Sequence, residues 1–182
     1  MVFRVEPGVS RFTIRAFATG MLSGFGHNPT FAIRRYTGEI RFDPDVPDAA
    51  SMMLQIVASS LELTDDVSSR DRREIERVMH EEVLEDTTYP AITYECQPPN
   101  AAVKKTGDEQ FDVAMTGDLT LHGQTRRQPI SARIVAGGSM LRAYGEFNVQ
   151  QSEFGIKPVS MAGSMLKIKD ELTCSFDLVA RP

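Results

Sequence analysis

The stretch Phe111-Asp112-Val113-Ala114-Met115-Thr116-Gly117-Asp118-Leu119-Thr120-Leu121 decides the fold class of this chain. Every second residue from Phe111 to Leu121 is apolar or glycine, whereas most of the residues between them are aspartate or threonine. In an extended strand, successive side chains point to opposite faces, so this alternation gathers the apolar residues on one face. The stretch therefore predicts a β-strand with one face buried against a core.

The same alternation recurs along most of the chain. It is clear at residues 11–16, 92–97 and 172–178, and weaker at 20–25, 31–42, 52–59, 130–136 and 141–149. Turn-forming residues separate these runs at 43–45, 98–100, 106–108, 122–123 and 137–138. Strands of this kind leave unpaired edges, and closure into a barrel removes them. The fold class is therefore all-β, a closed antiparallel barrel of about eight strands.

One segment, residues 71–86, breaks the period of two. Its apolar residues fall at helical spacing and are Ile75, Val78, Met79 and Val83. Asp71, followed three residues later by Glu74, resembles a capping box with Asp71 in the cap position. We expect one surface helix near residues 71–86, lying on the barrel or across one of its mouths.

Size and charge exclude several roles. At 182 residues the chain is within the usual range of one domain, so residues 1–182 are treated as a single domain. The net charge of −5 opposes binding to nucleic acid, whose backbone is polyanionic. No apolar run approaches the roughly 20 residues that a transmembrane helix needs. Arg4, Glu6 and Pro7 interrupt the N-terminus before a secretory signal develops, so we expect a cytoplasmic protein, unless a leader was removed from the chain.

The residues that usually carry catalysis or bind metal are not arranged for either. Cys96 and Cys174 lie far apart on apolar strand faces, so we expect two free, buried thiols. The histidines and carboxylates show no zinc-ligand spacing, and the G-x-S-x-G nucleophile motif does not occur. We therefore expect no catalytic residue, no metal and no required cofactor.

The order of several motifs resembles a known family. Phe42-Asp43-Pro44, Tyr89-Pro90-Ala91-Ile92-Thr93-Tyr94, Gly117-Asp118-Leu119-Thr120-Leu121-His122-Gly123-Gln124-Thr125 and Phe154-Gly155-Ile156 follow one another along the chain. Together they resemble the YceI-like proteins, lipocalin-like barrels associated with binding polyisoprenoids and other long-chain lipids. The resemblance implies a lipid-binding barrel that covers nearly the whole chain.

An eight-stranded barrel is either filled by its own side chains or holds one slender ligand. The ten phenylalanines and nine methionines favour a pocket, because methionine adapts to irregular apolar shapes. We expect the inward faces to supply the ligand-binding residues, namely Phe12, Ile14, Phe25, Ile40, Leu54, Ile56, Ile92, Tyr94, Met115, Leu119, Phe147, Phe154 and Phe176. His27, in a glycine-flanked loop, is a candidate donor to a ligand head group at the barrel mouth.

These observations support three hypotheses. The leading one is a binding protein that sequesters or carries a long hydrophobic small molecule, an isoprenoid, quinone or fatty acyl chain, inside the barrel. The main alternative is a structural or protein-interaction barrel with a filled core and no ligand. A weaker alternative is an enzyme that acts on a lipid held in the same pocket. Three alternatives are not decided by the sequence: which hydrophobic molecule is bound, whether the chain forms a homodimer, and whether the barrel interior is open or filled.

Overall fold

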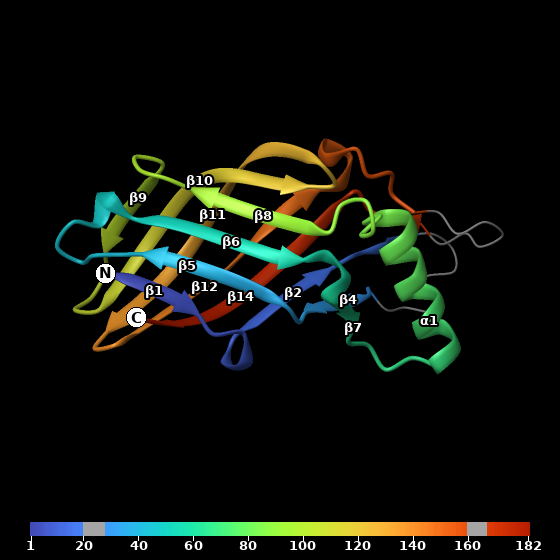
Figure 1. The fold of residues 1–182 in the computed structure, drawn as a ribbon, viewed down its shortest axis with the longest axis horizontal. Helices are drawn as coiled ribbons and strands as arrows, with labels where there is room; N and C mark the ends of the chain where they lie inside the picture. Colours follow the sequence, from blue (N-terminus) through green and yellow to red (C-terminus); the bar gives the residue numbers. More distant parts are fainter. Residues whose placement is uncertain (20–27, 160–166) are drawn as a thin grey trace.

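In the computed structural model, which describes residues 1–19, 28–159 and 167–182, eight strands form a closed antiparallel barrel (Figure 1). They pair in the order β1-β5-β6-β8-β10-β11-β12-β14, and β14 pairs with β1 to close the ring. Their bounds are Val2–Val5 for β1, Tyr36–Arg41 for β5, Ser51–Val57 for β6, Ala91–Cys96 for β8, Gln110–Leu121 for β10, Gln124–Gly137 for β11, Met140–Gln150 for β12 and Glu171–Arg181 for β14. The predicted closed barrel of about eight strands is confirmed.

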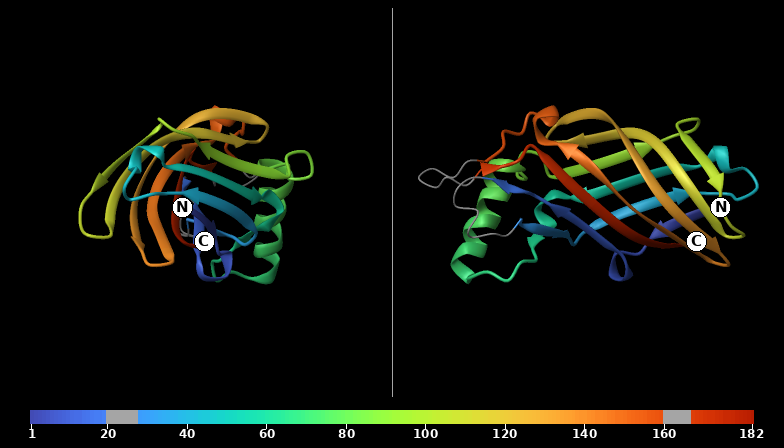
Figure 2. Two further views of the ribbon diagram at one scale, coloured as in Figure 1. Left: turned by 60° about the vertical axis from the view of Figure 1, so that its left-hand side comes forward. Right: turned by 180° about the vertical axis from the view of Figure 1, so that it is seen from behind.

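The remaining strands extend this ring. β2 (Arg11–Arg15), β4 (Thr30–Ile33) and β7 (Leu61–Leu63) continue from β14 at the end of the barrel where α1 lies (Figure 1). β9 (Ala101–Lys105) pairs with the first part of β10, whereas β3 (Ala18–Thr19) and β13 (Lys167–Ile168) form a separate two-stranded sheet. The two views in Figure 2 show the long strands wrapping around a common axis. The predicted strand at 20–25 lies outside the described residues.

β10 shows why the alternating residues form this wall. Phe111, Val113 and Leu119 are buried, whereas Asp112 and Asp118 are exposed on the outer face. The turn at His122-Gly123 leads the chain from β10 into β11. The whole length of β10 pairs with β11, from Gln110↔Val135 to Leu121↔Gln124. At the end of the barrel that carries the termini, Phe111 meets Phe42 edge to face, with ring centroids 5.0 Å apart. The alternation therefore sets both the inner face and the register of this hairpin.

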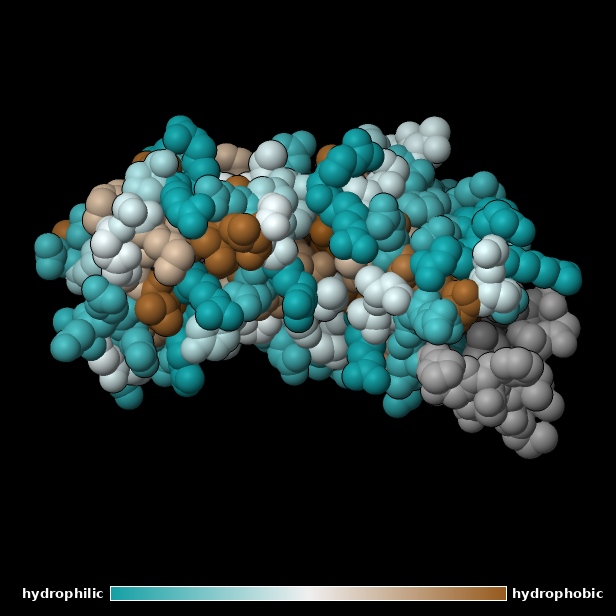
Figure 3. Space-filling model, turned by 90° about the horizontal axis from the view of Figure 1, so that it is seen from below, coloured by the Kyte–Doolittle hydropathy of each residue, from teal (hydrophilic) through white to brown (hydrophobic). Residues whose placement is uncertain are grey.

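The outer surface is predominantly polar. On the face drawn in Figure 3, apolar residues form small patches among polar ones. The large hydrophobic side chains that are exposed include Val9, Met53 and Met140. Scattered exposed apolar side chains are normal for a protein surface, so the apolar residues that distinguish this chain are those inside the barrel.

The predicted helix is present with different bounds. α1 spans Ser69–Arg77 and continues as a π-helix over Val78–Val83, so the helical segment starts two residues earlier and ends three residues earlier than predicted. The cap is Ser68 rather than Asp71, because the Ser68 hydroxyl accepts a hydrogen bond from the Asp71 amide at 3.1 Å. Asp71 instead accepts a hydrogen bond from the same hydroxyl through its carboxylate at 2.7 Å. In the described parts of the chain, no helix is long and apolar enough to cross a membrane.

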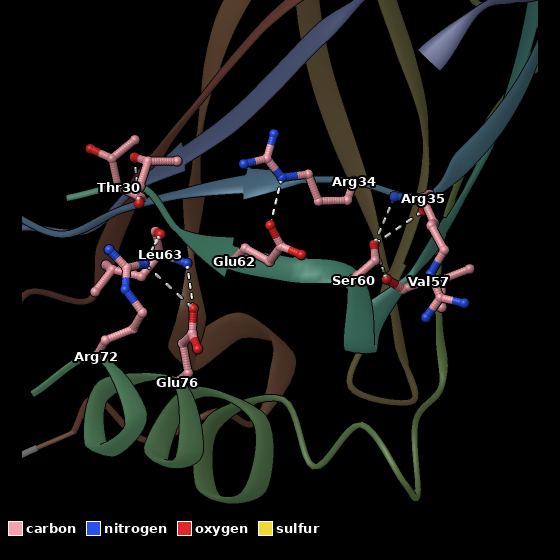
Figure 4. Close-up of polar contacts among 10 residues, drawn as sticks. Thr30, Arg34, Arg35, Val57, Ser60, Glu62, Leu63, Arg72 and Glu76 are labelled. Atoms are coloured by element: carbon pink, nitrogen blue, oxygen red, sulfur yellow. Dashed lines mark hydrogen bonds and ion pairs between the residues drawn. The ribbon is translucent and has the colours of Figure 1, made fainter. Parts of the chain in front are cut away.

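Side chains of α1 hold it against the free edge of β7. The Leu63 amide donates a hydrogen bond to the Glu76 carboxylate at 3.0 Å (Figure 4). The Arg72 guanidinium donates to the Leu63 carbonyl and, at 2.7 Å, to the Asp65 carbonyl. Backbone groups on an edge strand would otherwise be left unpaired. The helix therefore covers this edge and lies across one end of the barrel, as the sequence predicts.

Candidate ligand-binding site

An apolar cavity lies inside the barrel and extends to the end that carries the two termini. Its lining reaches Phe42, whose amide donates a hydrogen bond to the carbonyl of Met1 at 3.1 Å. Figure 1 places this end opposite α1. The described part of α1 and its π-helical continuation contribute no residue to the lining.

The cavity collects most of the predicted ligand-binding residues. Those that line it are Phe12, Ile40, Leu54, Ile56, Ile92, Tyr94, Met115, Leu119, Phe147 and Phe176. They come from β2, β5, β6, β8, β10, β12 and β14, so opposite walls of the barrel meet across the space. The alternation along these strands therefore located one common interior surface.

Two predicted residues do not line the described cavity, and two others cannot be placed relative to it. Ile14 lies on β2 and is partly buried against the core. Phe154 is fully buried, but it lies in the 3₁₀ helix Gln151–Phe154 rather than on a strand of the barrel wall. Phe25 and His27 lie outside the described residues. The predicted head-group donor His27 therefore stays a prediction.

Sequence reasoning missed other members of the lining. They include Phe42, Cys96, Ala101, Val113, Ile130, Ala132, Ile134, Ala143 and Leu178. Most of them continue an alternation already used: Ile130, Ala132 and Ile134 share one face of β11, and Leu178 follows Phe176 on β14. Extending each run to the end of its strand would have found these four residues, whereas Ala101 lies on β9, for which no run was predicted. The alternation of apolar residues gives no indication of the polar members of the lining, which are Arg41, Ser51 and Thr93.

The hydroxyl of Tyr94 is hydrogen-bonded on both sides. It accepts a hydrogen bond from the Gly117 amide at 2.9 Å and donates one to the Gln128 carbonyl at 3.2 Å. Gly117 and Gln128 are opposite each other in the β10–β11 ladder, so the hydroxyl stands between an amide and a carbonyl that face each other. Burial raises the pKa of the Tyr94 phenol far above its ordinary value, which keeps it protonated as a donor.

Glycine is required at residue 117 by this arrangement. A Cβ atom there would lie 2.4 Å from the Glu95 carbonyl oxygen and 2.6 Å from Cζ of Tyr94. Both distances are far below van der Waals contact, and the carbonyl belongs to the neighbouring strand β8. The absence of a side chain at Gly117 therefore makes room for the ring of Tyr94.

The side chain of Gln128 joins β11 to β12 where the two strands are not paired. β11 pairs with β12 over residues 133–137 and 140–144, and the earlier part of β11 is not paired with β12 in the same register. The side-chain amide of Gln128, which is buried, donates to the Asn148 carbonyl at 3.2 Å and to the Pro129 carbonyl at 3.0 Å. This buried amide therefore joins the two strands and has partners of its own.

The two cysteines are free and buried, as predicted. Cys96 lies in the cavity wall, and burial raises the pKa of its thiol. Burial also raises the pKa of the Cys174 thiol, to about 12. A thiol with a raised pKa is a poor nucleophile, because the thiolate is the reactive form. In the described ranges, no group of three or more histidine, cysteine, aspartate or glutamate side chains is placed to hold a metal ion.

A sequence model of the YceI-like domain matches residues 3–180. The chain belongs to the YceI-like family. Protein YceI of Shigella flexneri is 26% identical over 152 residues, which cover 78% of this chain and 71% of that protein. The motifs from Tyr89 to Tyr94 and from Gly117 to Thr125 form β8 and the β10–β11 hairpin of this YceI-like barrel.

Two solved structures share the fold of this YceI-like chain. BcnA of Burkholderia cenocepacia superimposes with a TM-score of 0.72 at 19% identity, covering 96% of this chain and 98% of BcnA. A polyisoprenoid binding domain of Saccharophagus degradans, implicated in plant cell wall breakdown, gives a TM-score of 0.70 at 14% identity and covers 98% of this chain and 97% of that domain. At these identities the likeness establishes the architecture of the barrel.

Proposed function

We propose that this YceI-like protein binds a long hydrophobic ligand, an isoprenoid, quinone or fatty acyl chain, inside its barrel and acts in carriage or sequestration rather than catalysis. The observation that carries the proposal is the apolar cavity formed by side chains from opposite walls of the barrel. A ligand of this class is in keeping with the polyisoprenoid binding domain that shares the fold. The cytoplasm is the proposed compartment, which fractionation of cells tests.

Burial of a hydrocarbon chain supplies the driving force. Each buried methylene contributes about 0.8 kcal/mol, so a chain of ten carbons gains about 8 kcal/mol. Association of two molecules costs roughly 4–15 kcal/mol, which a chain of ten to twenty carbons offsets. An apolar wall therefore suffices for binding, provided that the chain is long.

The cavity must widen to accept such a chain. Its volume is about 70 Å³. Ligand pockets usually have volumes of about 300–1,000 Å³. Four lining side chains, Met52, Met115, Phe147 and Phe176, are only partly buried against the core. Methionine changes conformation at low cost, so Met52 and Met115 are the side chains that we expect to move aside for a chain.

The small volume also favours a second candidate, a barrel filled by its own side chains that serves a structural or protein-binding role. The two candidates differ in what a larger side chain does inside the barrel. In a filled core, added volume typically costs about 1–3 kcal/mol of stability, and there is no ligand uptake to lose. In a binding barrel, the same change blocks uptake of a ligand.

Leu54→Trp and Met53→Trp make a matched pair for this test. Leu54 lines the cavity and is buried, whereas the neighbouring Met53 is 54% exposed on the outer face of β6. Uptake of a fluorescent long-chain fatty acid and the thermal midpoint are measured on the parent protein and on both variants. The proposal expects micromolar binding by the parent and by Met53→Trp, and at least about tenfold weaker binding by Leu54→Trp. A parent that takes up no probe, with Leu54→Trp strongly destabilised, establishes the filled barrel instead.

A further inference from the structure

Tyr94 lines the cavity, and its hydroxyl is used within the protein by the Gly117 amide and the Gln128 carbonyl, which belong to residues outside the lining. The Tyr94 hydroxyl has both a donor and an acceptor partner, and the Gln128 side-chain amide bonds to two carbonyls. Cys96, in the same wall, directs its thiol to the Asn100 carbonyl at 3.7 Å. A chain that passes these residues meets hydrocarbon, and a polar group on that chain would be buried without a partner.

The lack of a hydrogen-bond partner for a passing polar group depends on Tyr94. Without its hydroxyl, the Gly117 amide and the Gln128 carbonyl would each lose a partner in a buried place. The Tyr94 hydroxyl stands between the two groups, and a Cβ at residue 117 would meet Cζ of the Tyr94 ring at 2.6 Å. A phenylalanine ring occupies the same space, so removal of the hydroxyl alone leaves one donor and one acceptor free to bond to water or to a ligand.

We propose that Tyr94 determines the specificity of the cavity, because the pairing of its hydroxyl with the Gly117 amide and the Gln128 carbonyl leaves none of these three groups for a ligand, so that the cavity selects chains with no polar substituent along their length. The proposal rests on the lipid-binding function proposed above and narrows its ligand class. Plain acyl and isoprenoid chains satisfy the wall, whereas chains with a hydroxyl or keto group in their middle do not. The polar head group of an accepted ligand lies outside this part of the barrel.

Octadecanoic acid and 12-hydroxyoctadecanoic acid test this selectivity, because they have the same length and head group. Their affinities are measured by displacement of a fluorescent fatty acid from the parent, from Tyr94→Phe and from Tyr36→Phe. Tyr36 is the matched control, because its hydroxyl is also buried in the barrel but has no hydrogen-bond partner in the described parts of the chain. Circular dichroism establishes that each variant is folded.

The parent is expected to bind the plain chain at least about tenfold more tightly than the hydroxylated chain, because burial of an unpaired hydroxyl is costly. Tyr36→Phe is expected to keep that ratio. Tyr94→Phe is expected to reduce it to about threefold or less, because the freed amide and carbonyl bond to the ligand hydroxyl. Exchange of the Gly117 amide hydrogen, followed by nuclear magnetic resonance, is expected to accelerate in Tyr94→Phe alone.

Three results overturn the inference and are distinguishable from one another. If the parent binds both chains equally well, the selectivity is absent although lipid binding stands. If folded Tyr94→Phe keeps the ratio of the parent, Tyr94 does not determine the selectivity. If the parent binds neither chain, the lipid-binding function and the inference fall together. Should Tyr94→Phe not fold, the ratio measured on the parent still decides whether the wall excludes a polar group.

Discussion

The hydroxyl of Tyr94 lies 2.9 Å from the amide nitrogen of Gly117, inside the ladder that joins β10 to β11. The two residues depend on each other, because the tyrosine ring occupies the space that any side chain at residue 117 would need. A side chain of β8 thus completes the hydrogen bonding of two other strands. This contact fixes three neighbouring strands of the barrel relative to one another.

Gly117→Ala is expected to destabilise the protein by about 1–3 kcal/mol or more, because the added methyl group collides with Tyr94 and with the Glu95 carbonyl. The free energy of unfolding in urea measures the effect. Gly8→Ala is the control, since a Cβ at Gly8 meets no atom within 4 Å. We expect the control to change stability by no more than about 0.5 kcal/mol. Equal stabilities of the two variants would show that the ring of Tyr94 does not need this space.

Arg72→Ala is expected to loosen α1 from the edge of β7, because the Leu63 and Asp65 carbonyls lose their donor. The side chain is 37% exposed, so we expect a loss of stability of only about 1 kcal/mol. Hydrogen exchange of the Leu63 amide should accelerate as the helix moves away. Arg73→Ala, an exposed residue of the same helix, is the control and should leave that exchange unchanged. Identical exchange in both variants would contradict a role of Arg72 in holding the helix.

Both thiols are expected to be unreactive in the native protein, because Cys96 and Cys174 are buried and their pKa values are raised. Titration with a disulfide reagent at pH 8 should label neither cysteine quickly in the native state and both after denaturation. A native thiol that reacts within seconds, or a disulfide between the two cysteines, would contradict the structure.

Stability is expected to fall as the pH rises above 9. Burial raises the pKa of the Cys174 thiol from 9.0 to about 12, so between these values the unfolded chain loses a proton that the native protein keeps. The unfolded state then binds fewer protons, and the free energy of unfolding decreases with pH. In Cys174→Ala this decrease should be smaller between pH 8.5 and 10. Urea unfolding at several pH values measures this decrease. If the free energy of unfolding falls equally with pH in the parent and in the variant, Cys174 does not cause the decrease.

The sequence was sufficient to predict the barrel and much of its interior surface. Both follow from the alternation of apolar and polar residues, which can be read within each strand alone. Phe111 to Leu121 on β10 shows this, as do Leu54 and Ile56 on β6. Phe154 was placed wrongly in the wall, because it lies on a 3₁₀ helix, where alternation does not describe the inward face. The cap at Ser68 was missed in favour of Asp71, since both residue types favour that position.

The position of the Tyr94 hydroxyl could not be predicted. It joins Gly117 and Gln128, which are 23 and 34 residues away in the sequence, and the contact depends on three strands meeting in register. The small volume of the cavity has the same origin, because it depends on how side chains from opposite walls pack together. Patterns within one strand carry no information about either feature.

Lipid binding inside the barrel is tested on the protein purified from its native host. Native mass spectrometry before and after organic extraction shows whether a lipid is bound, and chromatography of the extract identifies it. We expect an added mass that extraction removes, and an extract dominated by an isoprenoid, quinone or acyl chain without a polar group in its middle. The extracted protein should take up that lipid at micromolar concentration. A protein of bare polypeptide mass that takes up none of these chains would rule out the binding barrel and leave a barrel filled by its own side chains.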